Sequence, residues 1–146
     1  MLLTQEGVSM ASVDVNTRKC GGRVVVTLRG VIDVLDAVSV AAALVAVAAQ
    51  EPEIIVDLAG VEFIDSSGVA ALVRGRKHAW HAGGDLLLAA PQQQVLRVLA
   101  ATRLIDVFSV HASVDEAASS PGRSRAEAAP VAGRPVSLAP VPLAVT

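Results

Sequence analysis

Three consecutive side chains near the middle of the chain could do chemistry, and a glycine follows them: Asp65-Ser66-Ser67-Gly68. They stand where an apolar strand pattern gives way to a helix pattern. At a helix N-terminus, free backbone amides and the positive end of the helix dipole favour an anion, and a phosphate on a serine suits such a position. Gly68 leaves out a side chain that would crowd a group approaching those amides. A plain N-cap at Asp65 or Ser66 is the other interpretation of the same four residues.

The elements around this segment alternate between strand and helix patterns. Strands are expected at residues 12–16, 24–29, 53–58, 85–90 and 107–110, the first two joined by a turn at Cys20-Gly21-Gly22. Helices are expected at 36–49 with Asp36 as N-cap, and at 67–81, 94–102 and 114–118, while 60–64 is expected to be a loop. This alternation predicts an α/β fold with a mixed, mostly parallel sheet of roughly 4–5 strands and about 4 helices.

Composition excludes several classes of protein. The chain has 146 residues, a formal net charge of −2 and one cysteine. Mild acidity argues against nucleic-acid binding, and one cysteine excludes an internal disulfide framework and a four-cysteine zinc site. The longest apolar run, Val38–Ala49, is shorter than the about 20 residues of a membrane span. Residues 1–10 do not resemble a signal peptide, so we expect a cytoplasmic protein that does not enter membranes.

The chain divides into three parts by composition. Residues 1–11 are expected to be an N-terminal extension and 12–119 a single domain. Five of the seven prolines lie in residues 120–146, among alanine and valine. Such a segment cannot bury enough apolar surface to offset its ordering entropy, so we expect a disordered tail. The tail is either a solvated extension or a docking segment for a partner.

The longer stretch V-D-L-A-G-V-E-F-I-D-S-S-G-V-A-A-L at 56–72 closely resembles the signature of STAS domains, specifically the bacterial anti-sigma factor antagonists. Gly30-Val31-Ile32-Asp33 resembles the G-x-x-D motif before that family's first helix. Residues 83–88 resemble the entry to its third strand, and 90–108 its third helix and last strand. The likeness covers about residues 12–118, and the resemblance therefore implies a STAS fold.

The resemblance also implies a function. In that family the serine directly after the aspartate receives a phosphate, which corresponds to Ser66. An unphosphorylated antagonist binds an anti-sigma factor, itself a serine kinase, and so frees a sigma factor. Phosphorylation abolishes binding, and a metal-dependent serine phosphatase restores it. Asp33, Asp65, Ser67 and Gly68 would form the docking surface for the partner, in a bacterial stress response acting on transcription.

Several alternatives stay open at this stage. Asp33 could be a turn residue without a functional role, and Asp65 could orient the Ser66 hydroxyl or cap the helix. Ser67 is expected to be a cap or first-turn residue rather than a second acceptor. The STAS fold could instead serve as a sensor that binds a nucleotide or another anion weakly, or as a scaffold that is never phosphorylated. The apolar helix at 38–49 is expected to be covered by the rest of the domain, the alternative being an exposed patch that binds a partner.

Catalysis by the chain itself is not expected. The G-x-S-x-G elbow of serine hydrolases is absent, because Ile64 stands two residues before Ser66. No phosphate-binding P-loop or dinucleotide fingerprint occurs, so no cofactor is expected. His78 and His81 could share one face of a helix, but the sequence offers no third metal ligand. Arg103 stands where the family has a glycine, and it would be strained if that position has a positive φ.

Overall fold

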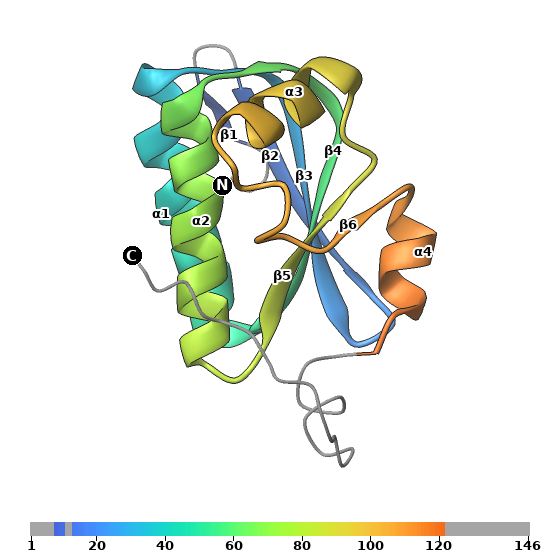
Figure 1. Ribbon diagram of the computed structural model, residues 1–146. Coiled ribbons are helices and arrows are strands. Elements are labelled where there is room, and N and C mark those ends of the chain that lie inside the picture. Colours follow the sequence, from blue (N-terminus) through green and yellow to red (C-terminus); the bar gives the residue numbers. More distant parts are fainter. Residues whose placement is uncertain (1–7, 11–12, 122–146) are drawn as a thin grey trace.

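A single mixed sheet forms the centre of the computed structural model, which describes residues 8–10 and 13–121 (Figure 1). The predicted tail from residue 122, most of the predicted N-terminal extension and the predicted strand start at Ser12 lie outside the described residues. The six strands follow each other in chain order across the sheet. They are β1 (Val8–Met10), β2 (Val13–Cys20), β3 (Arg23–Ile32), β4 (Glu53–Ile64), β5 (Asp85–Ala89) and β6 (Val110–His111).

The pairing of the strands agrees with the α/β prediction. The first three strands pair antiparallel, whereas β3, β4, β5 and β6 pair parallel. Gly21 and Gly22 form the predicted turn between β2 and β3, with φ of 58° and 83°. Four helices complete the described part of the chain, namely α1 (Val34–Gln50), α2 (Ser66–His81), α3 (Gln93–Ala101) and α4 (Val114–Ser119).

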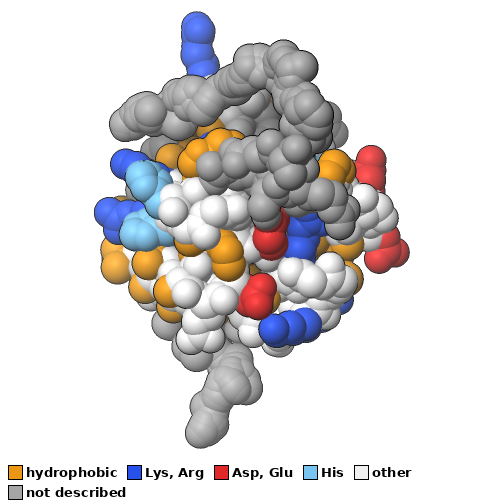
Figure 2. All heavy atoms as spheres, turned by 90° about the horizontal axis from the view of Figure 1, so that it is seen from below, with side chains coloured by type: hydrophobic (Ala, Val, Ile, Leu, Met, Phe, Trp, Pro, Cys, Tyr) orange, Lys and Arg blue, Asp and Glu red, His pale blue; other side chains and the backbone are white. Residues whose placement is uncertain are grey.

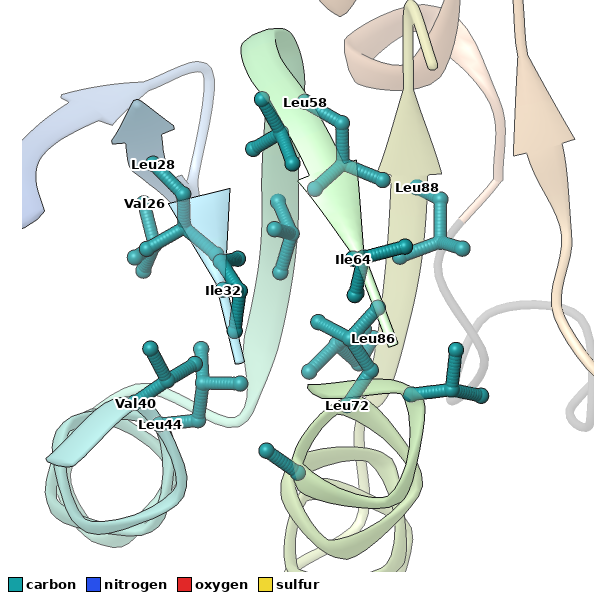
Figure 3. Packing of buried hydrophobic residues seen from close by; sticks show 14 of the residues in the cluster. Val26, Leu28, Ile32, Val40, Leu44, Leu58, Ile64, Leu72, Leu86 and Leu88 are labelled. Carbon is teal, nitrogen blue, oxygen red and sulfur yellow. The ribbon is translucent and has the colours of Figure 1, made fainter. Parts of the chain in front are cut away.

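The helices cover the two faces of the sheet unequally. Helices α1 and α2 lie side by side on one face, and α4 lies on the other (Figure 1). The main core fills the space between the sheet and the first two helices (Figure 3). Alternate strand residues supply it, as expected for a pleated sheet, and the labelled residues are fully buried: Val26, Leu28, Ile32, Val40, Leu44, Leu58, Ile64, Leu72, Leu86 and Leu88.

Two local contacts fix the positions of these helices. A Cβ added at Gly75 of α2 would lie 2.8 Å from Cβ of Leu44, so the absence of a side chain there lets α1 and α2 approach closely. On the other face, the buried Arg23 guanidinium donates to the carbonyl oxygens of Ala117 and Ala118 at 2.8 and 3.0 Å. It thereby caps the C-terminal end of α4 and holds this short helix against the sheet.

Strand β4 is longer than predicted, because residues 60–64 continue it instead of forming a loop. Gly60, Val61, Phe63 and Ile64 all pair with β3, and two register irregularities absorb the bend. The Asp57 carboxylate accepts from the amide of Ala59 at 3.1 Å, a local turn-like contact inside the strand. The Asp-x-x-Gly sequence from Asp57 to Gly60 therefore indicates an irregularity within the strand rather than the end of the strand.

The ends of α2 and α3 share one geometry. After α2, Gly83 has φ 97°, and the amides of Gly83 and Gly84 donate to the carbonyls of Trp80 and Ala79. After α3, Arg103 has φ 64°, and the amides of Arg103 and Leu104 donate to Ala100 and Leu99 in the same arrangement. Both are Schellman motifs, in which the left-handed position favours glycine. The conditional expectation for Arg103 is confirmed, since its backbone does adopt a positive φ.

Replacing Arg103 by glycine is expected to stabilise the protein. A non-glycine residue in this conformation costs about 1–2 kcal/mol, and part of that gain is offset by the larger entropy of glycine in the unfolded chain. We expect the free energy of unfolding to rise by about 0.5–1 kcal/mol in urea titrations of Arg103→Gly. Arg103→Ala, which keeps the Cβ, should show no such gain. An equal gain from alanine would assign the effect to the guanidinium and contradict the backbone explanation.

Candidate functional site

The candidate site lies where β3 and β4 end together at one edge of the sheet. Ile32 and Ile64 are paired in the parallel register, and the amide of Asp65 donates to the carbonyl of Ile32 at 3.2 Å. Each isoleucine is followed by an aspartate that begins a helix. Asp33 and Asp65 therefore occupy equivalent positions on adjacent strands, which are about 4.8 Å apart in a sheet.

Both aspartates are N-caps. The Asp33 carboxylate accepts from the amides of Leu35 and Asp36 at 3.0 and 3.3 Å. The Asp65 carboxylate accepts from the amide of Gly68 at 3.0 Å. Asp36 was expected to cap the first helix, and that prediction is wrong: Asp36 lies in the first turn and is 2% exposed. The cap is three residues earlier because Asp33 directly follows the strand and has extended backbone angles.

Ser66 occupies the first helical position of α2, one residue earlier than the predicted helix start at Ser67. Its side chain is exposed, and no hydrogen bond to its hydroxyl is found among the described residues. Ser67 is a half-buried first-turn residue, as expected. Of the two roles considered for Asp65, capping is the one that the hydrogen bonds show. The Ser66 oxygen is thus accessible to a protein partner from solvent.

Gly68 has a packing role that the sequence did not indicate. It is buried, and a Cβ there would lie 2.5 Å from Cγ1 of Ile64 and 2.9 Å from Cγ2 of Ile32. The missing side chain thus faces the strands rather than a ligand at the helix terminus. The glycine lets the first turn of α2 rest directly on the paired strand ends, which sets the height of Ser66 above the sheet.

Exposed apolar side chains surround the two caps. The large hydrophobic residues with high exposure are Val34 at 61%, Leu35 at 79%, Val38 at 74% and Phe63 at 48%. All belong to the first turns of α1 or the end of β4, and Phe63 pairs with Val31 just before the caps. Apolar patches beside a polar centre mark protein interaction surfaces. The prediction that the helix at 38–49 would be covered by the rest of the domain is wrong for its outward face, where Val38, Ala42, Ala46 and Ala49 are exposed.

Two hollows among the described residues lie away from this edge of the sheet. One of about 430 Å³ is lined by residues of β2 and β3, and one of about 390 Å³ lies between β2 and the end of α1. Neither includes Asp33, Asp65 or Ser66.

The basic end of α2 lies far from Ser66. His78 and His81 are in the last turn of this helix. Because a helix rises about 1.5 Å per residue, the length of α2 separates them from Ser66. Figure 2, seen from that end of the molecule, shows histidine side chains beside lysine and arginine side chains.

Within residues 8–10 and 13–121, no three histidine, cysteine or acidic side chains gather to hold a metal ion. None of the helices described here combines the length and apolar character needed to cross a membrane.

The fold and the site together define a mixed α/β domain with an accessible serine at a helix N-terminus. A model of the STAS domain family matches residues 14–117, which is most of the described chain. The protein belongs to the STAS domain family. The resemblance on which the fold was predicted is therefore confirmed.

Solved structures of similar fold include anti-sigma factor antagonists. One from Mycobacterium paratuberculosis is 26% identical, with a TM-score of 0.63 over 73% of this chain and 91% of its own. SpoIIAA in its unphosphorylated form is 23% identical, with a TM-score of 0.61 over 70% of this chain and 91% of its own. Bacillus SpoIIAA in its phosphorylated form is 22% identical, with a TM-score of 0.56 over 70% and 95%. The two SpoIIAA structures show a shared fold.

A methyl group at Gly68 is expected to destabilise the domain and displace the start of α2. The new Cβ of Gly68→Ala would overlap Ile32 and Ile64, and overpacking of this kind costs about 1–3 kcal/mol. Urea unfolding should show that loss. Ser67→Ala, one residue away and without a new contact, is the matched control and should stay close to the unchanged protein. Equal stability of both variants would contradict the packing role.

Proposed function

We propose that this protein is an anti-sigma factor antagonist whose binding is switched by phosphorylation of Ser66. The observation that carries the proposal is the exposed, unengaged hydroxyl of Ser66 at the first position of α2. Membership of the STAS family and the similarity to anti-sigma factor antagonists support it. In this proposal the chain is a binding protein and a kinase substrate, not an enzyme.

The covalent step is a phosphoryl transfer to Ser66. The Ser66 oxygen attacks the γ-phosphorus of ATP held by the kinase partner, the bond to the β-phosphate oxygen breaks, and ADP leaves. The hydroxyl proton passes to a base of the kinase. In the reverse direction a serine phosphatase uses water to hydrolyse the ester, which releases inorganic phosphate and restores the hydroxyl. Accessibility matters here, because the kinase must bring the γ-phosphorus into line with the serine oxygen.

Electrostatics around Ser66 explain how the phosphate would act as a switch. It adds about −1.5 to −2 charge, and the capping carboxylates of Asp33 and Asp65 stand at the same edge. The helix dipole returns only about 0.3–1 kcal/mol of stabilisation to an anion at this position. A partner that covers the site would have to desolvate three negative groups together, which costs several kcal/mol. The complex would therefore dissociate without any refolding of this domain.

The apolar residues beside the site give the unphosphorylated form something to bind with. Val34 and Phe63 flank the two caps and are 61% and 48% exposed. Burying them in a complex is favourable in proportion to the apolar area removed from water. The proposed docking surface thus combines a small apolar area, which supplies affinity, with one hydroxyl whose charge state decides whether the area can be covered.

Substitution of Ser66 should separate the two states. With the anti-sigma kinases of the source organism and radiolabelled ATP, Ser66→Ala should take up no phosphate and bind its partner as the dephosphorylated protein does. Ser66→Asp should bind at least about tenfold more weakly, since one added charge mimics part of the phosphate. Ser67→Ala is the control and should be phosphorylated normally. Stoichiometric phosphorylation of Ser66→Ala would falsify the assignment.

A second substitution tests the docking surface apart from the phosphate. Phe63→Ser should weaken the complex of the unphosphorylated protein by about tenfold, because a half-exposed aromatic ring no longer becomes buried. Binding can be followed by calorimetry with the purified partner. Thr27→Ser, at a half-buried position of β3 outside the site, is the control for a mild substitution in the sheet and should leave the affinity unchanged. Unchanged affinity of Phe63→Ser would move the docking surface away from this edge.

A further inference from the structure

Helix α1 has an outward face without charge. The helix spans 17 residues, and its one charged residue, Asp36, is buried. The outward face consists of exposed apolar side chains that recur three or four residues apart, namely Leu35, Val38, Ala42, Ala46 and Ala49. We call this set the α1 stripe. A solvent-facing helix surface is usually polar, so an uncharged stripe along the whole helix indicates a surface that another element covers.

The side chains of the α1 stripe are large at its N-terminal end and small at its C-terminal end. Leu35 and Val38 lie in the first turns, while the residues toward the C-terminal end are alanines. The positions are also symmetric about Ala42, which is the middle residue of α1. A helix with the same stripe running in the opposite direction would place Leu35 against Ala49, Val38 against Ala46, and Ala42 against its own copy.

We propose that α1 is a homodimer interface, in which a second copy of this chain packs its α1 antiparallel across a twofold axis at Ala42. Every bulky residue of the stripe then meets an alanine, which is the complementarity that close packing needs. An isologous twofold contact requires this relation of a surface to itself. An unrelated partner would not require the size pattern to reverse about the middle of the helix. The proposal does not rest on the function proposed for Ser66.

The energetics of such a pair are favourable and modest. No charge of the stripe has to be desolvated, which removes the main cost of burying a helix surface. Antiparallel helices also place opposite dipole ends next to each other. One helix pair buries less than the about 800 Å² per partner of a standard stable interface. We therefore expect a weak dimer, with a population that depends on protein concentration in the micromolar range or above.

Cysteine cross-linking tests the axis directly. In a Cys20→Ser background, Ala42→Cys should form a disulfide-linked dimer under mild oxidation, because residues on the twofold axis meet their own copies within the about 5.5–6 Å between Cα atoms that a disulfide favours. Ala70→Cys, at an exposed position of α2, is the matched control and should cross-link at least about tenfold more slowly. Equal rates for the two variants would overturn the proposal.

A mixing experiment tests the antiparallel register. Val38→Cys and Ala46→Cys should each cross-link poorly alone, whereas a mixture of the two should give the heterodimer in excess, because these positions oppose each other across the axis. Preferential self-cross-linking of Val38→Cys would indicate a parallel pair and overturn the arrangement. Each variant changes an exposed side chain, so the fold should be preserved, which circular dichroism checks.

Sedimentation equilibrium of the full chain tests the dimer without cross-linking. The unchanged protein should show an average mass that rises with concentration, and Leu35→Glu should raise the dissociation constant at least about tenfold. Ala70→Glu on α2 is the control and should leave it unchanged. A monomer at all concentrations overturns the proposal. If removal of residues 122–146 then produces dimers, the C-terminal segment covers the α1 stripe instead of a second copy. If only an anti-sigma partner protects Leu35 from solvent, that partner covers the α1 stripe.

Discussion

The registered ends of β3 and β4 are the constraint on which the rest of the structure depends. Ile32 and Ile64 lie side by side, and the amide of Asp65 is bonded to the carbonyl of Ile32. This junction places two aspartate caps at one edge and starts two helices from it (Figure 1). Gly68 then allows α2 to rest on the isoleucines without an intervening side chain. A small error in this packing would tilt α2 and move Ser66, so the position of this exposed serine is set by atoms that are themselves buried.

The sequence predicted the fold class and a helix start beside Asp65 because their signals are local. Backbone sterics and burial explain why apolar runs predict β4 and β5. They also explain why the sequence Asp-Ser-Ser-Gly predicts the start of α2. The glycine pair after α2 likewise ends that helix as expected, with Gly83 in the left-handed region. These features need no knowledge of distant residues. Their agreement with one another is what made the resemblance to STAS domains specific.

The errors have a common origin, since each depended on partners far away in the chain. Strand β4 extends to Ile64 because it pairs with β3. The sequence Asp-Leu-Ala-Gly is typical of a turn and does not indicate this pairing. The cap of α1 moved from Asp36 to Asp33 because β3 runs as far as Ile32, and this left Asp36 buried in the first turn. The role of Gly68 was misjudged for the same reason: its contacts are side chains of two strands. Composition alone also could not show which side of α1 faces the core.

Conservation of the domain's shape is compatible with a change in what it binds. Asp33 and Asp65 already use their carboxylates as caps, and residues 66–69 in the first turn of α2 include no lysine or arginine. A phosphate on Ser66 would therefore add to a negative edge. Under the proposed phosphorylation, the domain itself would gain and lose little stability. Phosphorylation would therefore change the free energy of binding the partner rather than the free energy of unfolding of the domain. A switch of this kind needs only that the modified atom lie inside the contact surface, which is the condition that an exposed Ser66 flanked by Val34 and Phe63 meets.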